Sequence, residues 1–230
     1  MSVALHAVEC AGAASERLLR ALAPFGVVVQ RVPQHLASAS SCLQHVDQAE
    51  IDRLLAMPPG SIALLTGPSG CGKSMLLRAT ASAMRARGGR VVDASALRAR
   101  AVADRPIIDL FSVSLLRSLR LLSAAGLGEA MLWARSAAEL SDGQHARLGI
   151  ALAMARVSKR RETLLLIDEC CSTLDRVTAR SVAQTLRRWC DQQRQRGTPV
   201  RVLCATAHDD LAESLSPDFL LCMEKTEPTP

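Results

Sequence analysis

The sequence predicts an α/β protein built on a mainly parallel sheet, and three observations lead to that prediction. Short apolar runs of strand length alternate with longer amphipathic segments of helical period after residue 61. A glycine-rich loop joins one of these runs to a helix, and an acidic pair closes another. Strands that alternate with helices are typical of parallel sheets, because a parallel connection needs a crossover helix.

The composition fits one globular domain and limits the classes of partner that the protein could bind. The 230 residues are 49% hydrophobic and 22% charged, which is ordinary for a folded protein with a sizeable core. Three Phe, two Trp and no Tyr provide few aromatic platforms, which argues against single-stranded nucleic-acid binding by base stacking. The net charge of +6 is scattered, so it predicts a solvated surface while leaving room for a nucleic-acid partner.

The cysteines and the lack of long apolar runs predict a soluble, cytoplasmic protein. The eight Cys include no C-x-x-C pair, so zinc binding is not expected. Several stand inside apolar strand-like runs, where a reduced thiol behaves as a small hydrophobic group, and reduced thiols indicate the cytosol. No uncharged apolar run reaches the ~18 residues that a membrane-spanning helix needs, and the N-terminus lacks the basic start of a signal peptide.

The elements can be placed from periodicity and from helix-breaking residues. Before residue 61 the pattern predicts a helix, a β-rich run and a second helix, over residues 15–23, 26–32 and 47–57. After it, the expected strands cover residues 61–66, 90–93, 163–169 and 200–207, and the expected helices cover residues 73–87, 144–158 and 177–195. Residues 107–138 are leucine-rich and are also expected to be helical.

The strongest motif is the glycine loop between the strand over residues 61–66 and the helix after it. It satisfies the phosphate-binding pattern G-x-x-x-x-G-K-[ST] with Gly67, Pro68, Ser69, Gly70, Cys71, Gly72, Lys73 and Ser74. The glycines allow backbone N–H groups to turn inward around phosphates, and the helix adds its positive N-terminus. Lys73 is expected to reach the β- and γ-phosphates of ATP, and the Ser74 hydroxyl to ligate Mg²⁺. The alternative, a plain glycine turn, is disfavoured by the flanking strand and helix.

An acidic pair supplies the second half of a nucleotide site. The apolar strand ending in Ile167 places Asp168 at its carboxyl end, beside the glycine loop, where it can hold the metal. Glu169 stands one residue further and is suited to polarise the attacking water as a general base. The pair is a weak signal alone, and it gains weight from lying ~95 residues after the loop in an α/β chain.

Three further segments resemble those of ABC-type ATPases. Residues 139–144 (ELSDGQ) resemble the LSGGQ signature, with Asp142 in place of its first glycine. Residues 170–175 (CCSTLD) resemble the family's D-loop segment, and His208 follows a strand where the family has its switch histidine. With the glycine loop and the acidic pair, these segments recur in the family's order over residues 61–210. The resemblance implies an ABC-type ATPase domain over residues 50–230, with an inserted helical subdomain at about 107–145. Residues 1–49 form an N-terminal segment that is part of the core or a small appendage.

The resemblance also implies a mechanism. Ser141, Gly143 and Gln144, at a helix N-terminus, are expected to bind the γ-phosphate of an ATP held by a second subunit, which gives a homodimer that sandwiches two ATP. In this mechanism Glu169 orients the attacking water and His208 contacts the γ-phosphate.

The sequence departs from the family in three places. No glutamine occupies the expected Q-loop, and Asp109 is the nearest polar substitute, as a third ligand of Mg²⁺ or as the N-cap of a helix that begins near Leu110. Only 31 residues separate Asp109 from Leu140, which is short for a transporter ATPase. His45 is the single ring near residues 43–50 that could stack on adenine.

Three functions are compatible with these motifs. The leading prediction is a soluble ABC-type ATP hydrolase whose dimer drives an event with an unknown protein or nucleic acid. Residues 105–109 (RPIID), 133–144 (WARSAAELSDGQ) and 174–179 (LDRVTA) together resemble a soluble branch in which the ATPase stands alone or is fused to an acetyltransferase-like domain. The alternative is the ATP-binding subunit of a membrane transporter with a separate permease, which the missing Q-loop glutamine and the short helical region disfavour. A P-loop kinase would need neither the signature nor Glu169.

Overall fold

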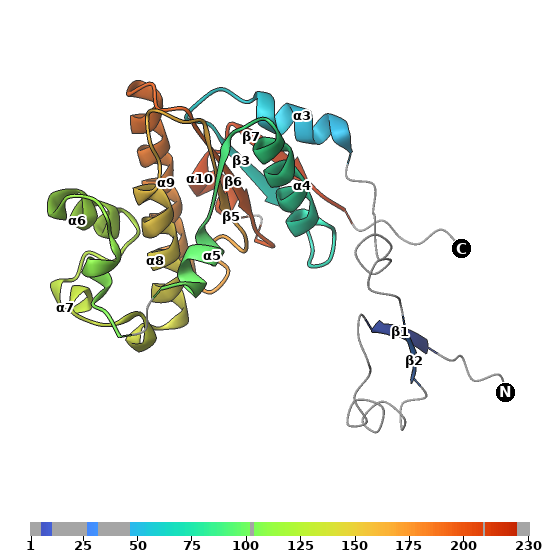
Figure 1. The fold of residues 1–230 in the computed structure, drawn as a ribbon, viewed down its shortest axis with the longest axis horizontal. Coiled ribbons are helices and arrows are strands. Elements are labelled where there is room, and N and C mark those ends of the chain that lie inside the picture. Colours follow the sequence, from blue (N-terminus) through green and yellow to red (C-terminus); the bar gives the residue numbers. More distant parts are fainter. Residues whose placement is uncertain (1–5, 11–26, 32–46, 102–103, 209, 225–230) are drawn as a thin grey trace. The chain divides into compact units, whose positions relative to one another are not determined.

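The computed structural model describes residues 6–10, 27–31, 47–101, 104–208 and 210–224 (Figure 1). The chain divides into two compact units, Met1–His45 and Val46–Pro230. In the first unit, strands β1 (His6–Cys10) and β2 (Val27–Arg31) pair in parallel. The helix expected over residues 15–23 and the candidate adenine ring of His45 lie outside the described residues, and the segment proposed over residues 1–49 stays a prediction.

The described part of the second unit forms a five-stranded, wholly parallel sheet. Its strands are β3 (Ile62–Thr66), β4 (Arg90–Asp93), β5 (Thr163–Ile167), β6 (Val200–Ala205) and β7 (Phe219–Cys222). The order across the sheet is β4-β5-β6-β3-β7, and every pair is parallel. The predicted strand positions are confirmed for the first four, each to within two residues of its expected ends.

The helices are those drawn in Figure 1, and they differ from expectation mainly between residues 107 and 138. They are α3 (Gln48–Ala56), α4 (Lys73–Ala86), α5 (Ala94–Ala99), η2 (Ile107–Leu110), α6 (Leu115–Ala124), α7 (Ala130–Trp133), η3 (Ala137–Glu139), α8 (Asp142–Ala155), α9 (Arg176–Gln195) and α10 (Leu211–Leu215). The expected helical stretch is a set of short pieces, because loops around Ser114 and Gly128 interrupt it.

Alternate residues along the strands face opposite sides of the sheet and pack in two separate layers of the core. Ala63 and Leu65 of β3 pack with the buried residues of α3 and α4, such as Leu54 and Leu77. Ile62 and Leu64 face the opposite side and pack in the cluster that includes buried residues of α8 and α9. Strands covered on both faces read as continuous apolar runs, which is why these strands were recognisable in the sequence.

Helix α8 joins the sheet to the helical insertion. Its residues Ile150 and Met154 pack in the core cluster of the sheet, while Leu148 and Leu152 pack in a third cluster with residues of α6 and α7. A helix that is apolar on both sides is buried between two layers. The signature segment at the start of α8 is therefore held rigidly by both parts of the unit.

A partly exposed carboxylate links the last part of the chain to the strand that precedes the glycine loop. Asp218 accepts hydrogen bonds from the Ile62 amide (2.9 Å), from Arg187 (2.6 Å) and from Arg194 (2.6 Å). Both arginines belong to α9, and both also donate to the carbonyl oxygen of Gly60. Asp218 thus ties α9 to the beginning of β3.

We expect Asp218→Asn to lower the free energy of unfolding by about 1–3 kcal/mol at pH 7, because the two arginines lose a charged acceptor. Although burial opposes them, hydrogen bonds from Arg187 and the Ile62 amide hold the pKa of Asp218 below its ordinary value. The charged form therefore stabilises the fold above the pKa of an unfolded Asp, and this contribution is lost as the pH falls through the lower folded pKa. Urea unfolding at pH 7 and at about pH 3 should show the difference shrinking at the acid pH. Asp191→Asn, which removes one surface partner of Arg187, is the matched control; an equal loss in both variants would contradict the linking role of Asp218.

Candidate functional site

The predicted site residues follow the carboxyl ends of three neighbouring strands. The glycine loop follows β3, the acidic pair follows β5, and His208 comes three residues after β6, which lies between β3 and β5 (Figure 1). Because all three strands are parallel, these segments meet at one edge of the sheet. Ligands of open α/β sheets bind outside this edge.

The glycine loop has the backbone that a phosphate cradle requires. Gly67, Gly70 and Gly72 have φ values of 139°, 83° and 97°, which L side chains rarely adopt. A Cβ at Gly67 would also stand 2.1 Å from the carbonyl oxygen of Met223, so the end of β7 presses on the loop. Helix α4 begins without a side-chain cap and without an acidic residue in its first turn, which keeps its amides available for an anion.

Lys73 is turned back onto the loop that precedes it. Its ammonium group donates hydrogen bonds to the carbonyl oxygens of Gly67 (2.5 Å) and Pro68 (2.8 Å). Ser74 follows in the first turn of α4 and is half-buried. The positive charge is therefore held beside the N-terminus of α4, where both act on an anion in the same place.

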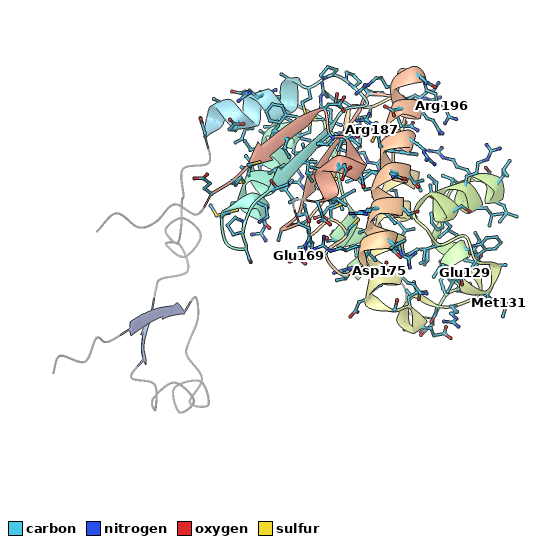
Figure 2. All side chains as sticks on the ribbon, turned by 180° about the vertical axis from the view of Figure 1, so that it is seen from behind. Glu129, Met131, Glu169, Asp175, Arg187 and Arg196 are labelled. Carbon is cyan, nitrogen blue, oxygen red and sulfur yellow. The ribbon has the colours of Figure 1, made fainter. Side chains whose placement is uncertain are left out.

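The acidic pair lies on a strained turn. Glu169 is exposed and has φ 52°, and Cys171 has φ 61°, so two non-glycine residues adopt left-handed backbone within three positions. The turn is held by Ser172, whose amide and hydroxyl both donate to the carbonyl oxygen of Glu169, and by the Cys170 amide, which donates to Ala205 of β6. Such strain turns the Glu169 side chain away from the core and towards solvent at the site (Figure 2).

The donor set suits a hard divalent cation. Asp168 is half-buried, and its Oδ1 accepts from the Glu169 amide at 3.1 Å. A hydroxyl from Ser74 and a carboxylate from Asp168 are oxygen ligands, which Mg²⁺ prefers, and the rest of its shell is usually phosphate and water. Among the described residues no three His, Cys, Asp or Glu are grouped to hold a metal by themselves. The residues present therefore fit a metal that arrives with a phosphate ligand.

The thiols behind the acidic pair are structural. Cys170 and Cys171 are buried, with their sulfur atoms 3.8 Å apart. The hydrogen bond with Cys170 and burial raise the pKa of the Cys171 thiol. Although the hydrogen bond with Cys171 opposes them, the hydrogen bond with Cys204 and burial raise the pKa of the Cys170 thiol. Neutral, buried thiols behave as small apolar groups and pack the turn below Glu169.

The signature segment presents an intact helix N-terminus at the surface. Ser141 is the N-cap of α8: its Oγ accepts from the Gln144 amide at 3.3 Å, while Gln144 Oε1 accepts from the Ser141 amide at 3.0 Å. This capping box leaves the Ser141 hydroxyl proton free to donate. Gly143 approaches its own chain closely, since a Cβ there would stand 2.8 Å from the Leu174 side chain. The segment that resembles the D-loop therefore supports the signature.

His208 and Asp175 are placed by the turns that carry them. His208 is exposed, and its amide donates to Thr206 Oγ1 at 3.2 Å. Asp175 caps α9 by accepting from the Thr178 amide at 2.9 Å, and the hydrogen bonds of Thr178 lower the pKa of this carboxyl. The next residue, Arg176, forms an ion pair with Asp210 at 2.5 Å. This pair ties the segment after β5 to the segment after β6 (Figure 2 labels Glu169 and Asp175 at this edge).

One of the two roles predicted for Asp109 is wrong. Asp109 is not the N-cap of a helix that begins near Leu110, because it is the third residue of η2, which starts after Pro106. The next helix, α6, begins after Ser114. A rigid Pro sets the extended backbone that starts η2, so no Asp cap is needed there. The side chain of Asp109 is exposed, and its role as a metal ligand stays a prediction.

We expect Asp109→Ala to change the melting temperature by less than about 2 °C, because no cap is lost. If Asp109 belongs to the metal site, the Mg²⁺ concentration for half-maximal ATP hydrolysis rises several-fold; colorimetric phosphate release against Mg²⁺ measures it. Asp104→Ala, a nearby exposed carboxylate, is the control. An unchanged Mg²⁺ requirement would remove Asp109 from the site.

Sequence reasoning missed the contribution of β7 to the site. The Met223 amide donates to the Thr66 carbonyl oxygen at 2.8 Å, and the Met223 carbonyl closes over Gly67. The signal available was the apolar run Phe219–Cys222 after Pro217-Asp218, which has the length and the boundary of a strand. Among the described residues, no helix combines the length and the apolar character needed to cross a membrane.

Comparison with known proteins gives a family match and several relatives. Residues 63–228 match the family model described as "ATPase family associated with various cellular activities (AAA)". The chain is 30% identical over 185 residues to the zinc import ATP-binding protein ZnuC of Ruegeria pomeroyi, a match that covers 75% of the chain and 68% of ZnuC. It is 35% identical over 153 residues to the aliphatic sulfonates import ATP-binding protein SsuB of Pseudomonas entomophila, covering 58% of the chain and 54% of SsuB. The chain thus spans about half to two thirds of the length of these relatives.

Two solved structures share the fold. The dimeric bacterial ABC transporter cassette MJ0796 aligns with a TM-score of 0.53 at 18% identity, over 73% of this chain and 82% of the cassette. UvrA2 from Deinococcus radiodurans aligns with a TM-score of 0.51 at 17% identity, over 72% of this chain and 33% of UvrA2. These alignments confirm the predicted α/β fold with its parallel sheet.

Proposed function

The chain belongs to the AAA/ABC ATPase family and so is an ATP-binding hydrolase, and we propose that it works as a homodimer with two ATP molecules in its interface. The ATP site of this proposal rests on the convergence of the glycine loop, the acidic pair and His208 at the carboxyl ends of the neighbouring strands β3, β5 and β6. The second subunit rests on the exposed signature turn at the start of α8. Phosphoryl transfer requires positioning and charge stabilisation, which this edge supplies.

In the proposed site the glycine loop and Lys73 bind the phosphates of ATP. Backbone amides at Gly70–Ser74 surround the β-phosphate, and the ammonium of Lys73 leaves the loop carbonyls to face the β- and γ-oxygens. The Ser74 hydroxyl and Asp168 hold Mg²⁺, which neutralises charge on the phosphate oxygens. Ser74 lies in the first turn of α4 and Asp168 directly follows β5, which supports this assignment.

Glu169 is assigned as the general base. Its strained, exposed position places a carboxylate just beyond the metal ligand Asp168, where it can accept a proton from the attacking water. His208, from the adjacent strand end, donates a hydrogen bond to the γ-phosphate.

A second subunit completes the site. Ser141 and the amide of Gly143 stand at the exposed start of α8, beyond the helical insertion, and are free to donate to an anion. Gln144 is engaged in the capping box, so we assign it to shaping this turn rather than to the phosphate alone. Two-fold symmetry gives each ATP one glycine loop and one partner signature.

We propose that the ATPase acts apart from a membrane permease. The helical insertion is short, with α6 of ten residues as its longest helix before α8, which agrees with the short separation of Asp109 and Leu140 in the sequence. The second candidate, the ATP-binding subunit of an importer, is favoured by the printed functions of the relatives ZnuC and SsuB. Affinity capture of ATP-trapped Glu169→Gln decides between them, because a membrane-spanning partner would support the importer.

We expect Glu169→Gln with ATP to elute as a dimer in light scattering and as a monomer with ADP, because the γ-phosphate is shared between the two subunits. Ser141→Arg in the same background should abolish this dimer, since it places bulk and charge at the capped turn. Ser158→Arg, outside the site, is the control. A monomer in every nucleotide state would contradict the sandwich while leaving ATP binding intact.

A further inference from the structure

A basic groove lies between α6 and α9, beside the loop that leaves α8. It encloses about 850 Å³. Helix α6 packs against both α8 and α9, on the side of α9 that faces away from the sheet (Figure 1). Five cations line the groove: Arg117, Arg120, Lys159, Arg188 and Arg196. Figure 2 labels Arg196 at the C-terminal end of α9.

The charge of this groove is uncompensated within the described residues. No acidic side chain is among its lining residues, and none of its five cations forms an ion pair in the described ranges. Arg187 and Arg194, on the same helix, differ, because both are paired with Asp218. Five like charges around one hollow raise a positive potential there, which favours an anionic ligand.

The groove is also apolar. Leu121, Ala124 and Val157 contribute to its lining, and Trp189 forms part of its wall. Leu116 stands at its mouth with 59% of its surface exposed, and the adjacent Leu115 is 65% exposed. Large exposed leucines beside an uncompensated basic surface indicate a partner that offers both apolar and acidic groups.

We propose that the groove binds an acidic amphipathic helix of a partner protein. The apolar side chains of such a helix would cover the exposed Leu116, while its carboxylates would pair with Arg120 and Arg188 at the rim. A nucleic acid would gain charge pairing but would leave the leucines in water, and a free phosphate would leave most of the hollow unfilled. The combination of charge and apolar surface therefore selects a peptide.

The groove is separate from the ATP site. Val157 and Lys159 precede β5, and Arg196 precedes β6, so these residues lie towards the amino ends of the strands. The glycine loop, Glu169 and His208 follow the carboxyl ends. Peptide binding and ATP binding therefore do not compete for the same atoms, and the proposal stands whether or not the dimer mechanism holds.

The test is fluorescence anisotropy of the full chain with a labelled synthetic helix of about 16 residues, with Leu at i and i+4 positions and Glu beside them. We expect saturable binding that weakens as salt rises, because charge pairs contribute to it. Arg120→Glu/Arg188→Glu should weaken binding by roughly tenfold or more, with basal ATP hydrolysis unchanged. Arg78→Glu, on α4 across the sheet, is the control for charge reversal, and a peptide with Ser in place of Leu should bind more weakly than the parent.

Three outcomes would overturn the proposal. One is the absence of saturable binding by the parent peptide, and another is equal binding by the double variant and the chain without substitutions. The third is tighter binding of a DNA oligonucleotide than of the peptide, with the oligonucleotide binding lost in the same double variant. That result would make the groove a nucleic-acid site. If circular dichroism shows that the double variant is unfolded, Leu116→Ser takes its place, because the Leu116 side chain is exposed. This substitution should weaken binding of the peptide without weakening binding of an oligonucleotide.

Discussion

Glu169→Gln is expected to lower the rate of ATP hydrolysis by about two to four orders of magnitude while ATP still binds. The amide keeps the shape of the side chain and its place on the left-handed turn, but it accepts no proton from water. Steady-state phosphate release gives the rate, and equilibrium binding of a fluorescent ATP analogue gives the affinity. The two measurements separate loss of chemistry from loss of binding.

The control for this experiment is Glu129→Gln, an exposed carboxylate on the helical insertion that makes no contact with the site (Figure 2). Its turnover should equal that of the chain without substitutions. Normal turnover in Glu169→Gln would mean that another group activates the water, and His208 would then be the first residue to test.

Lys73→Ala is expected to weaken ATP binding by about two orders of magnitude or more. The ammonium is the single cation in the glycine loop, and its loss leaves the β- and γ-phosphates with amide donors only. The change also removes the hydrogen bonds to Gly67 and Pro68, so the loop itself loses support. Isothermal titration with ATP and Mg²⁺ measures the affinity. The melting temperature without nucleotide measures how much stability is lost with the hydrogen bonds that Lys73 makes to the loop.

Lys159→Ala serves as the matched control, because it removes the same charge from the groove at the other edge of the sheet. It should leave ATP affinity within about twofold. If Lys73→Ala binds ATP as tightly as this control, the glycine loop is not the phosphate site, and the assignment of Ser74 and Asp168 to the metal fails with it.

Much of the fold could be predicted because its signals are local. The strand over residues 163–169 is a run of apolar residues buried on both faces, and the phosphate loop is defined by consecutive glycines, Lys73 and Ser74. The helix over residues 47–57 was recognisable from its pattern and from the helix-breaking residues that follow it. The structure shows that Asp47 caps it, accepting from the Ala49 amide at 2.9 Å.

The remainder depends on contacts between distant residues, which a single sequence does not display. Asp218 reads as a loop residue, yet it binds Arg187, Arg194 and the Ile62 amide, 156 residues away. Residues 107–138 have helical composition, but the packing of Ile107 and Leu122 in one small cluster breaks them into short pieces. The roles assigned to Ser141 and Gly143 rest on a second subunit, so a single chain gives their placement and not their ligand.

The strand order has a consequence for how the protein is made. Strand β3 (Ile62–Thr66) is flanked by β6 and β7, which emerge from the ribosome more than 130 residues later. During synthesis, β3 has neither neighbouring strand until more than 130 further residues have been added. Its apolar residues can form non-native contacts during this time. Release of Met223 from the ribosome then allows the phosphate loop to close. We therefore expect the nascent chain to complete its nucleotide cradle only after Met223 has emerged.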